Sequence, residues 1–389
     1  MSAVMPTYGR IEIAFECGNG AYLVATDGRR YLDFATGIAV NTLGHAHPRL
    51  ISALEEQSKK LWHCSNLYRI PEQERLAERL CEHSFGESVF FCNSGAEAME
   101  GVIKVARKYH SASGNPQRYR IITFDGAFHG RTLGTLAAGG NEKALEGFGP
   151  VMDGFDHVPF GDANAVRAAT TGETGAILVE PIQGESGVNP AANDFLAELR
   201  TIANEFAILL LFDEVQTGIG HTGKLFAYEW CSVTPDVMGL AKGLGGGFPI
   251  GAVVATEAAA IGMVSGTHGS TFGGNPLAVA AGNAVLDEIL ADDFLENVKA
   301  IGKYLHSRVG DVAARYPNII ESVRGQGLLL GMKCAITNMD LVADMRERGV
   351  LLVPAGDNVA RMLPPLIISE TEVDEAVSAL EMSCQELER

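Results

Sequence analysis

The chain has 389 residues and a formal net charge of −18 at pH 7. Such an acidic surface disfavours nucleic acid and anionic membrane as partners, because both would repel it. Hydrophobic residues make up 47% of the sequence and charged residues 20%, which is typical of a soluble globular protein with a sizeable core. We find no apolar run that could span a bilayer and no secretory signal pattern, so we expect a cytoplasmic protein.

The cysteines and two histidines are the first candidates for metal binding. The seven cysteines are scattered, and no two have C-x-x-C spacing. This pattern argues against a disulfide framework or a zinc site and predicts reduced, structural cysteines. His45 and His47 have no carboxylate or cysteine at metal spacing nearby, so we interpret them as structural and predict no metal.

From the N-terminus, two apolar runs flank Asp27-Gly28 and predict a β-hairpin over 21–34. A helix is expected from Pro48 to about Leu61. Short apolar runs then alternate with segments of helical periodicity. The predicted strands cover 89–92, 121–124, 176–179, 207–212 and 250–255, with helices such as 99–106 and 193–206 between them. This alternation predicts an α/β domain with a mainly parallel sheet covered on both faces.

After Pro276 the pattern changes to that of an α+β lobe. We predict helices over 277–290, 294–316 and 340–348, a glycine-edged strand over 325–331, a short strand over 350–354 and a final helix from Glu370. The N-terminal hairpin is expected to pack with this lobe. The predicted domains are therefore an N-terminal segment of the small domain (1–60), a large domain (61–276) and a C-terminal small domain (277–389).

Two glycine-containing segments offer competing interpretations. Residues 218–223 match G-x-G-x-x-G after an apolar strand, and Asp236 lies near the distance of a ribose-binding acid, which favours a dinucleotide site. However, residues 213–216 separate this loop from its strand, so the signal is weak. Ser94, Gly95 and Ala96 stand where a predicted strand turns into a helix, and the free N–H groups there can hold a phosphate. A plain helix cap made by Ser94 is the alternative, and the local sequence favours neither.

Asp213 and Lys242 are candidate catalytic residues. Asp213 ends an apolar strand, where catalytic groups of open α/β sheets gather. Lys242 is a single lysine among the small and apolar residues of 239–247. Partial desolvation would lower the pKa of such a lysine and make its amine nucleophilic. A solvated lysine in a glycine-rich loop is the alternative and, judged locally, the commoner case.

Taken together, the motifs resemble those of class III, fold-type I pyridoxal-phosphate aminotransferases over essentially the whole chain. In chain order they are TGIAVN at 36–41, GHAHP at 44–48, SGAEA at 94–98, FHGR at 128–131, EPIQGE at 180–185, DEVQ at 213–216, Lys242 and GSTFGGNP at 269–276. Within this class, MPTYGR at 5–10 and SNLY at 65–68 resemble acetylornithine aminotransferases. The resemblance implies pyridoxal 5'-phosphate as cofactor and a homodimer with shared active sites.

The resemblance also implies how the cofactor is held. Lys242 would form the Schiff base with the cofactor and move the proton, and Asp213 would pair with the pyridine nitrogen. Gln216 would bond the ring hydroxyl, and Phe128 would stack on the ring. His129, next to Phe128, is interpreted as a satisfied structural histidine because Lys242 already supplies the base.

The phosphate of the cofactor would be held by two chains. By resemblance, it would lie on the N–H groups of Gly95 and Ala96, with Ser94 able to add its hydroxyl. Thr271 of the partner subunit would reach the same phosphate, which is why the resemblance implies an obligate dimer.

Substrate binding would rest on arginines. The resemblance implies that Arg131 grips one carboxylate and Arg361 a second. Glu185 would pair with Arg361 while the amino donor is bound and release it for 2-oxoglutarate. The same resemblance places Tyr8 and Ser270 among the substrate-binding residues.

The chain departs from the family pattern at four positions. Ile38 stands where ornithine aminotransferases use an aromatic residue, which favours an N-acylated donor. Ser186 follows Glu185 where glycine is usual, and Arg69-Ile70 replaces a commoner Tyr-Asn pair. The predicted reaction moves the distal amino group of N-acetylornithine to 2-oxoglutarate, giving N-acetylglutamate semialdehyde and glutamate, as in arginine biosynthesis.

The sequence is also compatible with other functions. Related ω-aminotransferases would use ornithine, succinylornithine, succinyl-diaminopimelate or 4-aminobutyrate. A dehydrogenase using the loop at 218–223 is an alternative of another class, as is a non-catalytic cofactor-binding regulator. The presence of Lys242, Asp213, Arg131 and Arg361 favours an enzyme.

Overall fold

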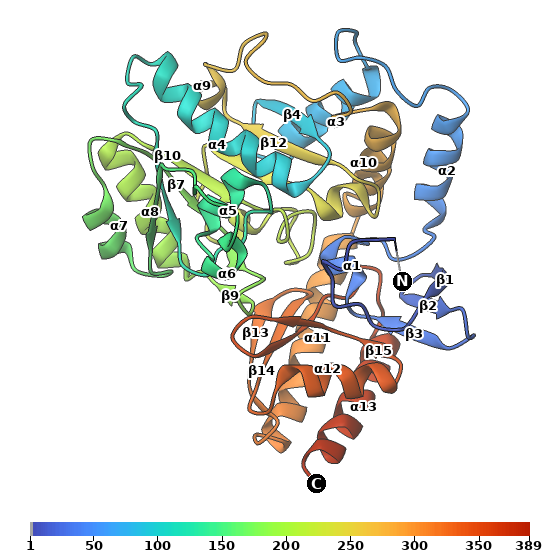
Figure 1. Cartoon of the computed structure of the whole chain (residues 1–389). Helices are drawn as coiled ribbons and strands as arrows, with labels where there is room; N and C mark the ends of the chain where they lie inside the picture. Colours follow the sequence, from blue (N-terminus) through green and yellow to red (C-terminus); the bar gives the residue numbers. More distant parts are fainter. Residues whose placement is uncertain (1–2) are drawn as a thin grey trace.

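A seven-stranded sheet forms the centre of the computed structural model, which describes residues 3–389 (Figure 1). Its strands, in spatial order, are β4 (Ser88–Cys92), β12 (Gly251–Ala255), β11 (Val237–Leu240), β10 (Leu209–Asp213), β7 (Thr174–Val179), β5 (Arg120–Phe124) and β6 (Phe155–Val158). Only β12 runs antiparallel to its neighbours. The prediction of a mainly parallel sheet is thus confirmed; β6 and β11 are additional strands.

Helices cover both faces of this sheet because consecutive residues of its central strands, which point to opposite faces, are apolar and buried. On one face, Ile122 of β5 and Leu210 of β10 pack with α7 (Ala163–Ala169) and α8 (Asn193–Phe206). On the other face, strand residues such as Leu211 pack with α4 (Gly95–Ala112), α5 (Leu133–Gly139) and α9 (Glu257–Ala260). A strand buried on two faces reads as a continuous apolar run, which is how these strands were predicted.

The predicted N-terminal hairpin is confirmed as β2 (Tyr22–Ala25) and β3 (Arg30–Asp33), preceded by β1 (Phe15–Asn19). β3 pairs in parallel with β15 (Val350–Leu351), so the hairpin packs with the C-terminal lobe as expected (Figure 1). The chain then forms α1 (Thr36–Ala39), α2 (Pro48–Ser58) and α3 (Pro71–Glu82). The domain boundaries at 60 and 276 stay predictions, and the first two residues of the segment 1–60 lie outside the described part.

The C-terminal lobe contains α10 (Pro276–Ile289), α11 (Phe294–Arg315), α12 (Asn338–Glu347) and α13 (Glu370–Leu387), close to the predicted helices. Its sheet has the order β13-β14-β17-β16, formed by β13 (Ile320–Gln326), β14 (Leu329–Cys334), β17 (Val359–Met362) and β16 (Val353–Ala355). The smaller remaining elements are α6 (Glu142–Leu145), β8 (Ile182–Gln183), β9 (Asn189–Pro190) and the 3-10 helices η1 (Ala227–Trp230) and η2 (Lys242–Gly245).

Two predictions in this lobe were wrong. Residues 325–331 are not one strand but the end of β13, a turn at 327–328 and the start of β14, because Gly327 has a φ of +61° and reverses the chain. Residues 350–354 are divided between β15 and β16, which belong to different sheets. Within residues 3–389, no helix combines the length and apolar character needed to cross a lipid bilayer.

Candidate active site

A pocket of about 400 Å³ opens where several strands of the large sheet end. The pocket is lined by nine of the predicted site residues: Ser94, Gly95, Ala96, Phe128, Arg131, Glu185, Asp213, Gln216 and Lys242. They lie at or directly after the ends of β4, β5, β8, β10 and β11, in loops or at the start of the next helix. The carboxyl ends of parallel strands meet at one edge, so the sheet itself gathers them.

Lys242 is the first residue of η2 and has a φ of +42°, unusual for a residue with a side chain. Among the described residues, none donates to or accepts from its amine. The surrounding protein lowers the pKa of Lys242 by removing water, while the charge of Glu185 partly opposes this effect. The amine is therefore more readily neutral than that of an ordinary lysine.

Asp213 is held in one orientation at the end of β10. One carboxylate oxygen accepts a hydrogen bond from the backbone N–H of Val215 at 3.0 Å, and the other lies 2.7 Å from Nδ1 of His129. His129 is buried, and its Nε2 has no partner within residues 3–389. No local pattern indicates this His129–Asp213 contact, although both residues lie in motifs that resemble those of the family.

Glu180 is a second pocket residue for which the sequence predicts no role of its own. Its carboxylate is buried in the pocket wall and accepts the backbone N–H of Phe128 at 3.1 Å. Burial raises the pKa of Glu180 well above its usual value, and the charge of Asp213 raises it further. Its position in EPIQGE, directly after β7, was the only signal available.

The helix-cap interpretation of Ser94 is confirmed by geometry. Ser94 is the N-cap of α4, and its hydroxyl accepts the backbone N–H of Glu97 at 3.2 Å. A Cβ on Gly95 would lie 2.8 Å from a methyl group of Val215, so the two loops pack closely at this point. The positive end of the 18-residue helix α4 faces the pocket, and binding of a phosphate there stays a prediction.

Arg361 lies fully buried on β17, where it does not line the pocket itself but contacts two residues that do. Its guanidinium contacts Glu185 Oε1 at 2.8 Å and Gln216 Oε1 at 3.3 Å. Burial alone would raise the pKa of Glu185, but the charge and hydrogen bond of Arg361 together lower it. Arg131, by contrast, is exposed, with its guanidinium 5.4 Å from the centre of the Phe128 ring.

Some predicted residues do not line the pocket of the single chain. Tyr8 is 76% exposed, and Ile38 and Thr271 are also exposed. The hydroxyl of Ser270 accepts a hydrogen bond at 3.1 Å from Asn93, which does line the pocket. The substrate and cofactor roles of these residues therefore stay predictions.

The loop at 218–223 lacks the context of a dinucleotide site. The next element is the short 3-10 helix η1 rather than an α-helix. The carboxylate of Asp236 already accepts hydrogen bonds from Arg200 and from the backbone N–H of Leu210. His45 bonds Asp33 at 2.8 Å, in line with its structural interpretation. Nowhere in residues 3–389 do three or more His, Cys, Asp or Glu side chains form a potential metal cluster.

Comparison with known proteins identifies the family. The model of the family described as "Aminotransferase class-III" matches residues 4–383. The chain belongs to this family. This class-III aminotransferase is 57% identical to acetylornithine aminotransferase 1 of Bradyrhizobium diazoefficiens, over 98% of this chain and 94% of that protein.

Two solved structures show the fold of a fold-type I aminotransferase. N-acetylornithine aminotransferase from Stenotrophomonas maltophilia has a TM-score of 0.85 at 36% identity, covering 98% of this chain and 97% of that one. An ornithine aminotransferase from Toxoplasma gondii has a TM-score of 0.94 at 30% identity, covering 99% and 93%. Pyridoxal phosphate partially occupies the active site of that Toxoplasma protein.

Proposed function

We propose that this class-III aminotransferase moves the distal amino group of N-acetylornithine to 2-oxoglutarate. The observation that carries the proposal is the 57% identity, over nearly the full length, with an acetylornithine aminotransferase. Ile38, which replaces an aromatic residue of ornithine aminotransferases, supports an N-acylated donor. The products would be N-acetylglutamate semialdehyde and glutamate, as in arginine biosynthesis.

The residues of the pocket fit pyridoxal 5'-phosphate. An unpaired amine on Lys242, a buried carboxylate on Asp213, an aromatic ring on Phe128 and the N-terminus of α4 all face one space of about 400 Å³. The Toxoplasma relative holds the same cofactor in its active site. When bound, this cofactor supplies an electron sink for the carbon that loses its proton.

The roles of this chain's own residues follow from their chemistry. Lys242 would anchor the cofactor and move the proton, because its lowered pKa makes the neutral amine available. Asp213, kept in place by His129 and Val215, would hold a proton on the ring nitrogen. Gly95, Ala96 and Ser94 would bind the phosphate, Phe128 would stack on the ring and Gln216 would bond its hydroxyl.

Two arginines would bind the substrates in turn. Arg131 is exposed at the pocket mouth, where it can grip a carboxylate of either substrate. Arg361 is neutralised by Glu185 in this structure, which suits a donor without a second carboxylate at that point. Release of Arg361 by Glu185 would admit 2-oxoglutarate, so one site serves both half-reactions. Tyr8 and Ser270 would contribute to donor binding.

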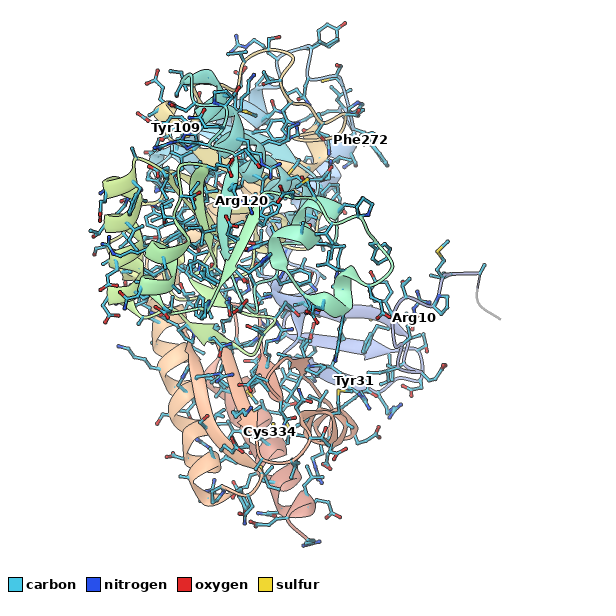
Figure 2. All side chains as sticks on the ribbon, turned by 60° about the vertical axis from the view of Figure 1, so that its left-hand side comes forward. Arg10, Tyr31, Tyr109, Arg120, Phe272 and Cys334 are labelled. Carbon is cyan, nitrogen blue, oxygen red and sulfur yellow. The ribbon has the colours of Figure 1, made fainter. Side chains whose placement is uncertain are left out.

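We further propose a homodimer that completes each site with Thr271 of the partner subunit. Support comes from an exposed apolar surface around Trp62, Leu67, Tyr68 and Phe272, the last of which packs against the His63 ring. Figure 2 shows Phe272 at the periphery of the chain. Apolar surface of this kind marks a contact with another protein.

The test is a substrate panel with the purified holoenzyme. Acetylornithine, succinylornithine, succinyl-diaminopimelate, ornithine and 4-aminobutyrate are each offered with 2-oxoglutarate, and kcat/KM is compared. We expect acetylornithine to be preferred. A preference for free ornithine or 4-aminobutyrate would contradict the proposal. A protein that shows no visible absorption, even after pyridoxal phosphate is added, would contradict the proposed cofactor as well.

A further inference from the structure

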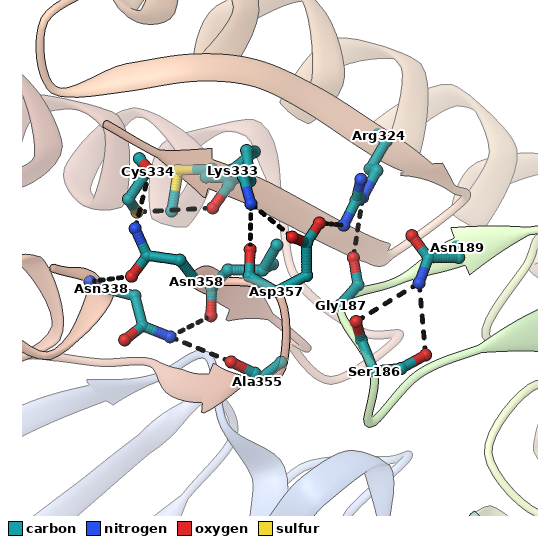
Figure 3. A network of polar contacts seen from close by, with 12 residues as sticks. Ser186, Gly187, Asn189, Arg324, Lys333, Cys334, Asn338, Ala355, Asp357 and Asn358 are labelled. Atoms are coloured by element: carbon teal, nitrogen blue, oxygen red, sulfur yellow. Dashed lines mark hydrogen bonds and ion pairs between the residues drawn. The ribbon is translucent and has the colours of Figure 1, made fainter. Parts of the chain in front are cut away.

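A polar network joins the C-terminal lobe to the loop that carries Glu185 (Figure 3). Arg324, on β13, contacts both sides of this junction. Its Nε donates to the carbonyl of Gly187 at 2.8 Å, and its terminal nitrogen pairs with Asp357 at 2.8 Å. One guanidinium therefore bridges the 185–189 loop and the turn between β16 and β17.

The β16–β17 turn is fixed by further contacts. Lys333 donates to the Asp357 carbonyl at 2.6 Å and also pairs with its carboxylate. Asn358 donates to the carbonyl of Cys334 at 2.8 Å. Asp357 and Asn358 both have positive φ values of about 50°, which L-residues adopt rarely, so these contacts hold the turn in a strained conformation.

The two segments also touch each other directly. The N–H of Gly356 donates to the carbonyl of Glu185 at 2.8 Å. Gly187 has a φ of +121°, and a Cβ there would lie 2.7 Å from the Arg324 guanidinium and 2.9 Å from the Gly356 carbonyl. There is consequently no room for a side chain between the loop and the turn.

The members of the Glu185–Arg361 ion pair stand on these two segments. Glu185 begins the loop, and Arg361 lies on β17 shortly after the turn. They are 176 residues apart in sequence, yet their side chains meet at 2.8 Å. Because the pair is short and partly buried, its geometry depends on how the two backbones are held relative to each other.

We propose that Arg324 is a positioning residue of the Glu185–Arg361 pair and thereby sets the preference of the site between its two substrates. The inference rests on the proposed function. With Arg324 intact, Glu185 neutralises Arg361 and the site accepts a donor without a carboxylate there. Without Arg324, the Gly356–Glu185 backbone bond alone joins the loop to the turn, and the Glu185–Arg361 contact loosens. The less compensated charge of Arg361 then disfavours that donor while it still attracts a dicarboxylate.

The kinetic test uses the holoenzyme with Arg324→Ala and Arg324→Lys, and follows each half-reaction separately. We expect Arg324→Ala to lower kcat/KM about tenfold for acetylornithine and less than about twofold for 2-oxoglutarate. A lysine side chain carries a single point charge and cannot hold Gly187 and Asp357 at the same time as the forked guanidinium does. The kcat/KM of Arg324→Lys for acetylornithine should therefore lie between those of the wild type and Arg324→Ala.

Arg308→Ala is the matched control. Arg308 pairs with Asp374 at 2.7 Å, with side chains 38% and 46% exposed, against 28% and 47% for Arg324 and Asp357. Its pair joins α11 to α13 and does not reach the loop of Glu185. The kcat/KM of Arg308→Ala should stay within about twofold of the wild-type value in both half-reactions. Equal losses in the two half-reactions of Arg324→Ala, or no loss, would overturn the inference.

A crystal structure of Arg324→Ala separates this inference from the proposed function. We expect the Glu185–Arg361 contact to be longer than the 2.8 Å of the intact chain. An unchanged contact would overturn the inference whichever donor the enzyme uses. A lengthened contact in an enzyme that rejects acetylornithine would support the inference and refute only the proposed donor.

Discussion

Lys242 differs from an ordinary surface lysine because its amine faces the pocket without a partner within residues 3–389. Replacing it with alanine removes the proposed anchor and base, and we expect kcat to fall by about 10²-fold to 10⁴-fold or more, the range for loss of one acid–base group. The measurement is the rate of glutamate formation, together with the visible absorption of the holoenzyme. Lys224→Ala, beside Trp230, is the control and should retain its rate. Full activity in Lys242→Ala would refute the assignment.

The charges around Lys242 predict a pH dependence. Because burial lowers the pKa of Lys242, its amine should stay reactive below the ordinary lysine value of 10.5. Glu185 raises this pKa and Arg361 lowers it, so Glu185→Gln should move the midpoint to still lower pH. Capture of pyridoxal phosphate by the apoprotein, followed across pH, gives both midpoints. A midpoint that rises in Glu185→Gln would contradict this account.

At the scale of elements, the β13–β14 hairpin reverses the chain at Gly327. Gly327 has a positive φ, and a Cβ there would lie 2.4 Å from the backbone of Thr222 in the large-sheet region. We expect Gly327→Ala to reduce the free energy of unfolding by about 2–4 kcal/mol through strain and overpacking. Denaturant titration measures the change.

Gly310→Ala supplies the opposite case. Gly310 lies within α11, and a Cβ there meets no atom within 4 Å. Alanine should therefore stabilise the protein by about 0.5–1 kcal/mol through helix propensity. If both substitutions changed stability equally, the close packing at Gly327 would not be the cause.

At the scale of the whole molecule, the exposed apolar surface predicts association. Leu67 is 88% and Phe272 59% exposed in the single chain, and Asn66 bonds the carbonyls of Ser270 and Gly273, which keeps the two loops together. We expect a dimer in sedimentation experiments. Phe272→Glu should shift it toward monomer and lower activity, because a charge would be buried in the interface and Thr271 of the partner subunit displaced.

Met382→Glu serves as the control for this substitution. Met382 is exposed on α13, away from the loops around Phe272, so a charge there should leave the association unchanged. A wild-type protein that sediments as a monomer at micromolar concentration would contradict the proposed dimer and the shared phosphate site.

Local sequence patterns determined much of the secondary structure of this protein. Apolar periodicity predicted α8 at its observed bounds, and Asp27-Gly28 predicted the hairpin of β2 and β3, because these signals act over a few residues. Motif order over the whole chain also predicted the family. The turn at Gly327 was missed because a glycine within an apolar run is compatible with either a strand or a turn.

Only the tertiary structure decided which distant groups meet. His129 bonds Asp213, and Glu180 holds the backbone of Phe128. Such contacts depend on strand order and on how the two lobes pack, which no local pattern specifies. The lowered pKa of Lys242 belongs to the same class, because desolvation is a property of the assembled pocket rather than of the lysine itself.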